Sequence, residues 1–305
     1  MTMKANGKSK SRIGLLVDSL RLVARKIRDA FSRYQWFLGY KFSESAAMPG
    51  TFSDLKYIVP PKDRFWADPF PVEIEDKYFI FVEEFVYTRN KGHISVIEID
   101  QGGAWKEPVK VLQKDYHLSY PFTFEWEGHL YMMPESSHNN NIEVYRCTAF
   151  PHSWEPAGVL LQDVQAVDAT LHQVDGLWWM FVNIGTERVS LNDELHLYYA
   201  DTPFGPWKPH RCNPVKSDVR SARPAGRLFY HEGDLFRPSQ DCSVSYGHAI
   251  TLNKVCCLNP DEYREEQVDR ILPQWRRGIH GVHTLNKAGR LTVVDCLQYR
   301  RRGPF

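Results

Sequence analysis

Two sets of polar residues recur along the chain at intervals of about 50 residues. The first set recurs at steps of 52, 48, 55 and 60 residues and comprises Asp68, Tyr120, Asp168, Arg223 and His283. The second set follows one hairpin later and comprises Glu83, Glu135, Asn183 and Gln240. Carboxylates on opposite sides of a channel can make or break glycosidic bonds, because one acts as base or nucleophile while another controls protonation. We therefore predict catalytic roles for Asp68 and Asp168, with Glu135 and Glu83 as candidate proton donors. A polar, water-filled channel without chemistry is the alternative.

The segments around these residues predict short β-strands separated by turns. Each unit begins with a strand such as Trp66–Phe70, continues through an acidic or Asp-Gly type turn, and returns in a second strand. Three units then carry a tryptophan, at Trp105, Trp154 and Trp207. Five such units of four strands predict an all-β fold, a five-bladed β-propeller over residues 42–305, whose inner strands border a central channel. A β-sandwich with irregular loops is the alternative, but it does not require the repeated turns and tryptophans.

The repeat also suggests residues that bind a substrate. Tyr120 and His283 share the position of Asp68 and are expected at the channel. Trp66 is expected to face a ligand, because it lies two residues before Asp68 and alternate residues of a strand point to the same side. Arg223, together with Arg237, presents the planar guanidinium groups that bind phosphate or carboxylate.

Charge is distributed unevenly along the chain. The formal net charge is +1, but residues 1–33 carry +7 and the remaining residues −6. Apolar residues from Ile13 to Tyr34 recur at three- and four-residue steps, a spacing typical of an amphipathic helix. We therefore expect residues 1–41 to form a basic amphipathic helical arm, with residues 12–37 lying on an anionic membrane surface. A helix packed against its own domain is the alternative.

The composition restricts the class of protein. With 43% hydrophobic and 25% charged residues, the chain is that of a globular protein, and its near-neutral total gives no reason to expect nucleic-acid binding. We find no apolar run suited to a membrane span or a cleaved signal peptide. The six cysteines lack CxxC spacing and are expected to be reduced thiols. These features predict a cytoplasmic protein, peripheral on the inner face of the plasma membrane.

Several of these segments resemble a known enzyme family. Asp68-Pro69 and Val167-Asp168, followed by an Asp-Gly hairpin and by Gly205-Pro-Trp207, look like the five-bladed glycoside hydrolases of family 43. The resemblance implies that Asp68 is a general base and that Asp168 orients and tunes the acid. The chain departs from that pattern at Arg223, where those enzymes carry their acidic glutamate. Residue spacing predicts no metal site, although the resemblance implies that a divalent cation such as calcium could lie near His283.

A closer resemblance covers about residues 55–300. It is to the N-terminal domain of plant glucosamine inositolphosphorylceramide transferase and its stand-alone bacterial relatives. The stretches that carry it are Phe65–Phe70, His117–Phe122, Met133–Ser136, Val167–Thr170, Ala222–Gly226, Arg237–Asp241 and His283–Asn286. This resemblance implies a glycan-related propeller, and it adds Gln240 and Asp241 to the expected binding residues.

The arginine in place of an acid favours one reaction over another. Arg223 cannot usefully donate a proton, but it can hold a phosphate, and a phosphate leaving group needs little protonation. We therefore expect glycosyl transfer from a sugar nucleotide or sugar phosphate to a glycan or glycolipid acceptor, with no cofactor. A hydrolase that uses Glu135 or Glu83 as acid, and a non-catalytic glycan-binding module, are the alternatives.

Overall fold

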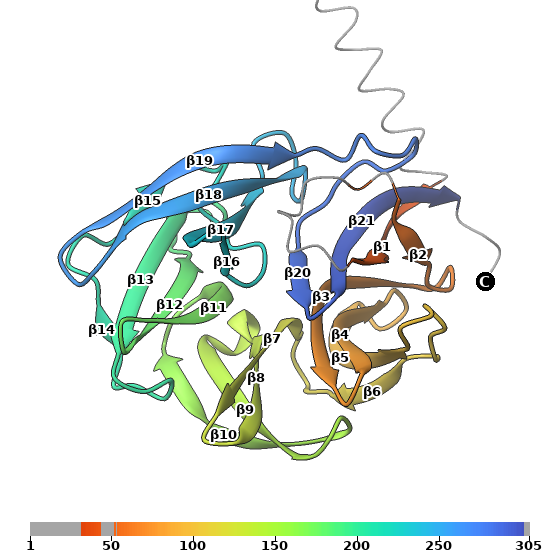
Figure 1. Ribbon diagram of the computed structural model, residues 1–305, viewed down its shortest axis with the longest axis horizontal. Coiled ribbons are helices and arrows are strands. Elements are labelled where there is room, and N and C mark those ends of the chain that lie inside the picture. The colour runs from red at the N-terminus through yellow and green to blue at the C-terminus, as the bar shows by residue number, and fades with distance from the viewer. Residues whose placement is uncertain (1–31, 44–51, 53, 302–305) are drawn as a thin grey trace, which may run out of the picture.

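The computed structural model describes residues 32–43, 52 and 54–301 of the chain. Its strands form five antiparallel sheets arranged around a central axis (Figure 1). This arrangement confirms the predicted all-β class and the five-bladed β-propeller. Within the described residues, η1 (Ser137–Asn139) is a short 3-10 turn, and no helix there has the length and apolar character needed to cross a membrane.

The first three blades take their strands in chain order, from the axis outward. Blade 1 contains β3 (Arg64–Ile74), β4 (Lys77–Val86), β5 (Lys91–Ile99) and β6 (Val109–Leu112). Blade 2 contains β7 (Ser119–Trp126), β8 (His129–Glu135), β9 (Asn141–Ala149) and β10 (Ser153–Gln162). Blade 3 contains β11 (Ala166–Val174), β12 (Leu177–Ile184), β13 (Glu194–Ala200), β14 (Lys208–Pro209) and β15 (Lys216–Ser217).

The last blade joins the two ends of the described chain. Blade 4 still follows chain order, with β16 (Phe229–His231), β17 (Asp234–Asp241), β18 (Ala249–Leu258) and β19 (Tyr263–Ile271). Blade 5 instead runs outward through β20 (Leu285–Ala288), β21 (Leu291–Arg301), β1 (Ser32–Phe42) and β2 (Lys56–Ile58). Strand β1 pairs with β21 along its whole length, from Ser32 opposite Arg301 to Phe42 opposite Leu291. An early strand therefore closes the ring against the last one.

The predicted helical arm is wrong where it overlaps β1. Residues 32–41 belong to the propeller, so the boundary expected at residue 42 falls inside this blade. The consecutive residues Trp36, Phe37 and Leu38 are all buried, so both faces of β1 are covered by other parts of the propeller. The sequence of a fully buried strand does not alternate between apolar and polar residues as that of a half-exposed strand does. Its apolar residues can therefore be interpreted as part of a helix. The helix expected over residues 1–31 lies outside the described residues.

The inner strands of blades 1 to 3 share a β-bulge at the repeated position. In β3, β7 and β11, two residues lie opposite one residue of the next strand. The first of the two, Asp68, Tyr120 or Asp168, has a positive φ of 50°, 42° or 54°. A left-handed backbone costs these residues about 1–3 kcal/mol each, and a bulge re-aims the side chain. The repeat thus holds in the backbone as well as in the sequence.

Blades 4 and 5 reach the same position without a bulge. Arg223 and His283 precede β16 and β20, which are short inner strands. Single bridges tie these two segments to the next strand, Pro224 to Ser239 and Gly281 to Leu297. Side chains from all five blades are thereby brought to one end of the axis.

Candidate active site

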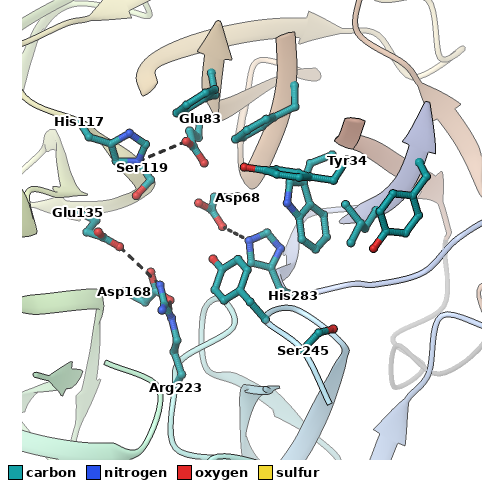
Figure 2. Close-up of a pocket in the computed structure, with 16 residues that line it drawn as sticks. Tyr34, Asp68, Glu83, His117, Ser119, Glu135, Asp168, Arg223, Ser245 and His283 are labelled. Carbon is teal, nitrogen blue, oxygen red and sulfur yellow. Dashed lines mark hydrogen bonds and ion pairs between the residues drawn. The ribbon is translucent and has the colours of Figure 1, made fainter. Parts of the chain in front are cut away.

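A cavity of about 450 Å³ lies at this end of the axis, and side chains from all five blades surround it (Figure 2). Its charged and titratable residues are Asp68, Glu83, His117, Glu135, Asp168, Arg223 and His283. The remaining lining residues are aromatic, apolar or small: Tyr34, Trp36, Phe65, Phe85, Ser119, Ser245, Tyr246, Leu297 and Tyr299. Carboxyl groups outnumber basic groups in this lining.

Asp68 is buried, and both of its carboxylate oxygens accept hydrogen bonds. The hydroxyl of Thr284 donates to Oδ1 at 2.9 Å, and the backbone N–H of Tyr120 donates to Oδ2 at 3.2 Å. Nε2 of His283 lies 3.3 Å from Oδ1. Burial raises the pKa of Asp68 to about 6, against the opposing charge of His283. Asp68 is therefore a better proton acceptor than an ordinary aspartate and is still largely ionised at neutral pH.

His283 lies between Asp68 and a second buried carboxylate, Asp295. Nδ1 of His283 is 2.6 Å from Oδ2 of Asp295. Asp295 also accepts the backbone N–H groups of His283 and Thr284 at Oδ1, at 2.9 and 3.0 Å, and that of Asp68 at Oδ2, at 3.1 Å. Burial acts to lower the pKa of His283, but the charges of Asp295 and Asp68 outweigh it and raise the pKa. The two carboxylates thus favour the protonated form of the imidazole beside Asp68.

Asp168 is paired with a guanidinium group. Nε of Arg223 donates to Oδ2 of Asp168 at 2.6 Å, and the amide of Gln240 donates to the same oxygen at 2.7 Å. Burial raises the pKa of Asp168 to about 6, while Arg223 opposes the shift. Gln240 also donates to the carbonyl oxygen of Pro224 at 2.9 Å, which fixes its amide beneath the ion pair.

Arg223 uses its three nitrogens differently. Nε is bound to Asp168, and Nη1 donates to Oδ1 of Asn192 at 2.9 Å. Nη2 lies 3.8 Å from Oε2 of Glu135, which is beyond hydrogen-bonding distance. The guanidinium carbon is 5.0 Å from the ring centroid of Tyr246, a cation–π contact. Nη2 therefore retains donor capacity for a ligand.

Glu83 has surroundings unlike those of Asp68. Within the described residues, no group donates a hydrogen bond of normal geometry to the carboxyl group of Glu83. The nitrogen Nε2 of His117 approaches its Oε1 to 3.3 Å. Burial, followed by the charges of Asp68 and Glu135, raises the pKa of Glu83 well above the usual range. Glu83 is thus the carboxyl group of the cavity best suited to carry a proton at neutral pH.

Aromatic rings form much of the cavity wall. Trp36 stacks on His283 with ring centroids 4.1 Å apart, and Tyr246 meets the same imidazole edge-on at 5.2 Å. Tyr34 and Tyr246 remain 51% and 45% exposed, so both present ring surface to a ligand at the rim. Aromatic faces beside hydrogen-bonding groups are suited to sugars, which carry both apolar C–H surface and hydroxyl groups.

Trp66 and Tyr120 do not line the cavity, contrary to expectation. Trp66 is 1% exposed and packs edge-on against Trp105 at 6.3 Å. The bulge at Asp68 breaks the alternation of side chains along β3. Trp66 and Asp68, although two residues apart, therefore do not lie on the same side of the strand. Tyr120 is fully buried, and its hydroxyl bonds to Thr170 and accepts the backbone N–H of Gly226, both at 2.8 Å.

Three residues of β17 also lie outside the cavity lining. Arg237 is fully buried and donates to Glu265 at 2.8 and 2.7 Å, so it cannot clamp a ligand. Asp241 is bound by Arg270 and Ser243. Gln240 points inward but supports Asp168 and does not line the cavity. The pleat of β17 puts Arg237 and Asp241 on the side away from Gln240.

Several cavity residues had no counterpart in the sequence prediction of the site. His117 lies in the stretch that precedes Tyr120, and Tyr246 lies in a loop of blade 4. Asp295 comes from β21, lies behind the cavity lining, and accepts the backbone N–H groups of Asp68, His283 and Thr284. Tyr34 and Trp36 had been assigned to the basic arm. His117 lies in one of the stretches that carry the family resemblance, as do the lining residues Phe65 and Ser119.

The divalent cation near His283 that the family 43 resemblance implies does not fit the side chains present. Asp68, His283 and Asp295 do place donor atoms within 4.8 Å of one another. Both imidazole nitrogens, however, face carboxylate oxygens, and Asp295 is already bound by three backbone N–H groups. Because the pKa of His283 is raised, its imidazole favours the positively charged form at the place where a metal ion would otherwise lie. We derive no step through a metal.

Comparisons with known proteins agree with this architecture. The family model for the N-terminal region of glucosamine inositolphosphorylceramide transferase 1 matches residues 53–293. The chain belongs to this family. Glucosamine inositolphosphorylceramide transferase 1 of Oryza sativa subsp. japonica is 39% identical over 219 residues, and that of Arabidopsis thaliana is 36% identical over 222 residues. Each match covers 70% of this chain but only 29% and 28% of the two plant proteins.

Solved structures share the fold at low sequence identity. A family 117 glycoside hydrolase from Zobellia galactanivorans aligns with a TM-score of 0.52 and 14% identity, over 88% of this chain and 90% of its own. A family 43 β-xylosidase/α-arabinofuranosidase from a compost metagenome aligns with a TM-score of 0.55 and 12% identity, over 78% and 91%. These similarities establish the propeller and carry no conclusion about the reaction.

Proposed function

We propose that this chain transfers a sugar from a phosphate-activated donor to a glycan or glycolipid acceptor, in the assembly of a cell-surface polysaccharide or glycolipid. Its relatives are named as transferases that act on a glycolipid, although the chain spans less than a third of their length. The observation that carries the proposal is the contrast between Glu83 and Asp68. Among the described residues, none donates a hydrogen bond to Glu83, whereas Asp68 accepts two hydrogen bonds and also lies beside the imidazole of His283.

This contrast assigns the two groups to opposite proton transfers. Asp68 accepts the proton of the acceptor hydroxyl, and the oxygen so activated forms a bond to the anomeric carbon. The bond between that carbon and the leaving oxygen breaks, and Glu83 donates its proton to the leaving oxygen. Solvent then returns the proton from Asp68 to Glu83. Asp168 stays paired with Arg223 and sets the charge beside the reacting carbon.

Arg223 is the donor-binding group in this proposal. Its Nη2 retains hydrogen-bonding capacity toward the cavity, so a phosphate oxygen can accept there while Nε remains on Asp168. The anion clamp is therefore one arginine, not the expected pair with Arg237. Isothermal titration with a sugar nucleotide and with the corresponding neutral sugar, on wild type and on Arg223→Lys, tests this step. We expect the variant to lose affinity for the nucleotide alone. Equal losses for both ligands would remove Arg223 from donor binding.

Asp68→Asn tests the catalytic role. The amide keeps the size of the side chain but cannot accept the proton, so turnover should fall by about 10² to 10⁴ while sugar binding changes little. Asp201→Asn, at an exposed position outside the cavity, is the matched control and should retain full turnover. Unchanged activity in Asp68→Asn would remove this residue from the mechanism.

The raised pKa of Glu83 also favours a second candidate, hydrolysis of a glycosidic bond with water in place of the acceptor. Release of free sugar from an oligosaccharide without an acceptor distinguishes it from transfer. In a hydrolase, Glu83→Gln should recover activity on a glycoside with an activated leaving group, since that group needs no proton. Glycan binding without either turnover would identify a non-catalytic glycan-binding module.

We further propose that the cavity mouth faces the cytoplasmic leaflet of the plasma membrane. Strand β1 begins and strand β21 ends beside the cavity, where Arg33 lies next to the exposed Tyr34 and opposite Arg300. The basic residues 1–31 precede this point in the sequence. Flotation with anionic liposomes should recover the full chain, and recover less of a chain that begins at Ser32. Equal flotation of both would exclude a role for residues 1–31.

A further inference from the structure

His117 faces Glu83 in a single protonation form that the backbone imposes. The N–H of Gly92 donates to Nδ1 of His117 at 2.9 Å. A ring nitrogen that accepts a hydrogen bond carries no hydrogen, so the proton of the neutral imidazole must lie on Nε2. Nε2 is 3.3 Å from Oε1 of Glu83, a distance that can shorten when a ligand fills the cavity (Figure 2).

The approach of Gly92 to this pair requires a glycine. A Cβ atom at residue 92 would lie 2.6 Å from the carbonyl oxygen of Leu118. It would also lie 2.8 Å from both Oε1 of Glu83 and Cε1 of His117. Any side chain would therefore separate strand β5 from His117 and remove the hydrogen bond that sets the tautomer. The arrangement of Gly92, His117 and Glu83 is a tightly packed unit.

We propose that His117 is a positioning residue that fixes the acidic proton of Glu83 on Oε2. When a ligand fills the cavity and the 3.3 Å gap closes, Nε2–H donates to Oε1, and the proton of Glu83 then occupies the other oxygen. When Glu83 gives this proton to a leaving group, the same N–H stabilises the carboxylate that forms. The inference rests on the proposed function, in which Glu83 is the acid.

A neutral imidazole is essential to this arrangement. A charged one would favour the ionised form of Glu83 and remove its proton before the reaction. Burial, together with the neighbouring His138, lowers the pKa of His117 to about 4. The rings of His138 and Phe85 lie 5.6 and 5.9 Å from that of His117. The carboxyl groups that act on Glu83 are Asp68, Glu135, Asp295 and Asp168.

Nitrogen NMR of the full chain tests the protonation form without any substrate. In protein labelled with ¹⁵N-histidine, we expect the His117 signals to report an Nε2–H tautomer that does not titrate between pH 8 and pH 5. The spectrum of His117→Gln assigns these signals. A protonated Nδ1, or titration near pH 6.5, would overturn the proposal. This outcome does not depend on whether the protein turns over a sugar.

Leaving-group dependence tests the positioning role once a turnover assay exists. His117→Gln keeps an N–H donor near Oε1, so most activity should remain. His117→Leu should lose at least about 10-fold in kcat on a substrate with a poor leaving group, and much less on an activated one. An equal loss on both substrates would contradict positioning of the acid. If NMR shows the predicted tautomer but the protein turns over no substrate, the geometry of His117 is confirmed and the proposed function alone is contradicted.

Discussion

Asp68 and Glu83 are carboxyl groups on adjacent strands of one blade, yet their surroundings give them different proton affinities. Backbone and hydroxyl donors converge on Asp68, whereas Glu83 has only a neutral imidazole nearby. Burial raises the pKa of both, but hydrogen bonds and His283 limit the increase at Asp68. At the residue scale, the donors around a side chain decide its role more than its type does.

His283 should contribute stability that depends on pH. Its pKa in the fold is raised above the ordinary value of 6.5, so its contribution is fully present below pH 6.5 and is lost as the pH rises through the raised value. Relative to wild type, His283→Gln should therefore be most destabilised in acid, with the difference shrinking at alkaline pH. Urea unfolding from pH 5.5 to 9 measures this. The exposed His129→Gln is the control. A difference that grows with pH would contradict the assignment of His283 as a cation.

Arg237 should matter for stability and not for binding. It pairs with Glu265 where both side chains are nearly inaccessible, at 0% and 4% exposure. Arg237→Met leaves a buried carboxylate with only Lys216 as a charged partner, so we expect a loss of about 3–5 kcal/mol in the free energy of unfolding. The exposed pair of Arg211 and Asp261 is the control, and Arg211→Met should leave the free energy of unfolding almost unchanged. Similar losses in chemical denaturation would contradict the structural role of Arg237.

At the scale of the elements, the repeat could be predicted because blades 1 to 3 use their inner strands in the same way. Asp68 and Asp168 recur at one register position, and that position survives the loss of the bulge at Arg223 and His283. Strand pleat and bulges were harder to infer. Trp66 precedes a bulge that changes the side on which later residues lie, and Arg237 is buried on the face of β17 away from Gln240. The spacing of residues in the sequence reveals neither feature.

The assignment of β1 depends on a partner that is distant in sequence. Its pairing with β21 joins residues more than 200 positions apart, and no local pattern within residues 32–42 encodes that contact. The same reason explains why Asp295 was missed, since it supports Asp68 and His283 from the far end of the chain. Local patterns predicted the blades, whereas the closure of the ring required the structure.

Gly39→Val tests the placement of β1. A Cβ at this position would lie 2.9 Å from Cδ1 of Leu55 and 3.3 Å from Cγ2 of Val294, so valine overpacks the blade. We expect a loss of about 1–3 kcal/mol in the free energy of unfolding, measured by denaturant titration. At Gly158 a Cβ meets only Val144, at 3.8 Å, so Gly158→Val is the control with a small effect. A neutral Gly39→Val would contradict a packed strand.

At the scale of the whole molecule, Tyr120 connects blades across the axis. Its hydroxyl contacts Thr170 of blade 3 and Gly226 of blade 4, while its backbone N–H contacts Asp68 of blade 1. The side chain that was expected to bind substrate therefore holds the inner strands together. This arrangement fixes the relative positions of the blades that supply the candidate catalytic groups.

Tyr120→Phe should weaken this connection without emptying the core. Losing the hydroxyl leaves the N–H of Gly226 without its partner, which should cost about 1–3 kcal/mol. Thermal and urea unfolding measure the loss. Tyr230→Phe, at a side chain that is 59% exposed, should be close to neutral. Equal stabilities of the two variants would show that the hydroxyl of Tyr120 contributes nothing to the free energy of unfolding.

The pairing of β1 with β21 also bears on how the protein is made. During synthesis, β1 leaves the ribosome early, but its partner follows only after the residues of all the other blades. Until then β1 is an apolar strand with unpaired backbone groups, the kind of segment that promotes aggregation. The nascent chain therefore has to keep this strand shielded, by a chaperone or by provisional contacts, until β21 has been synthesised.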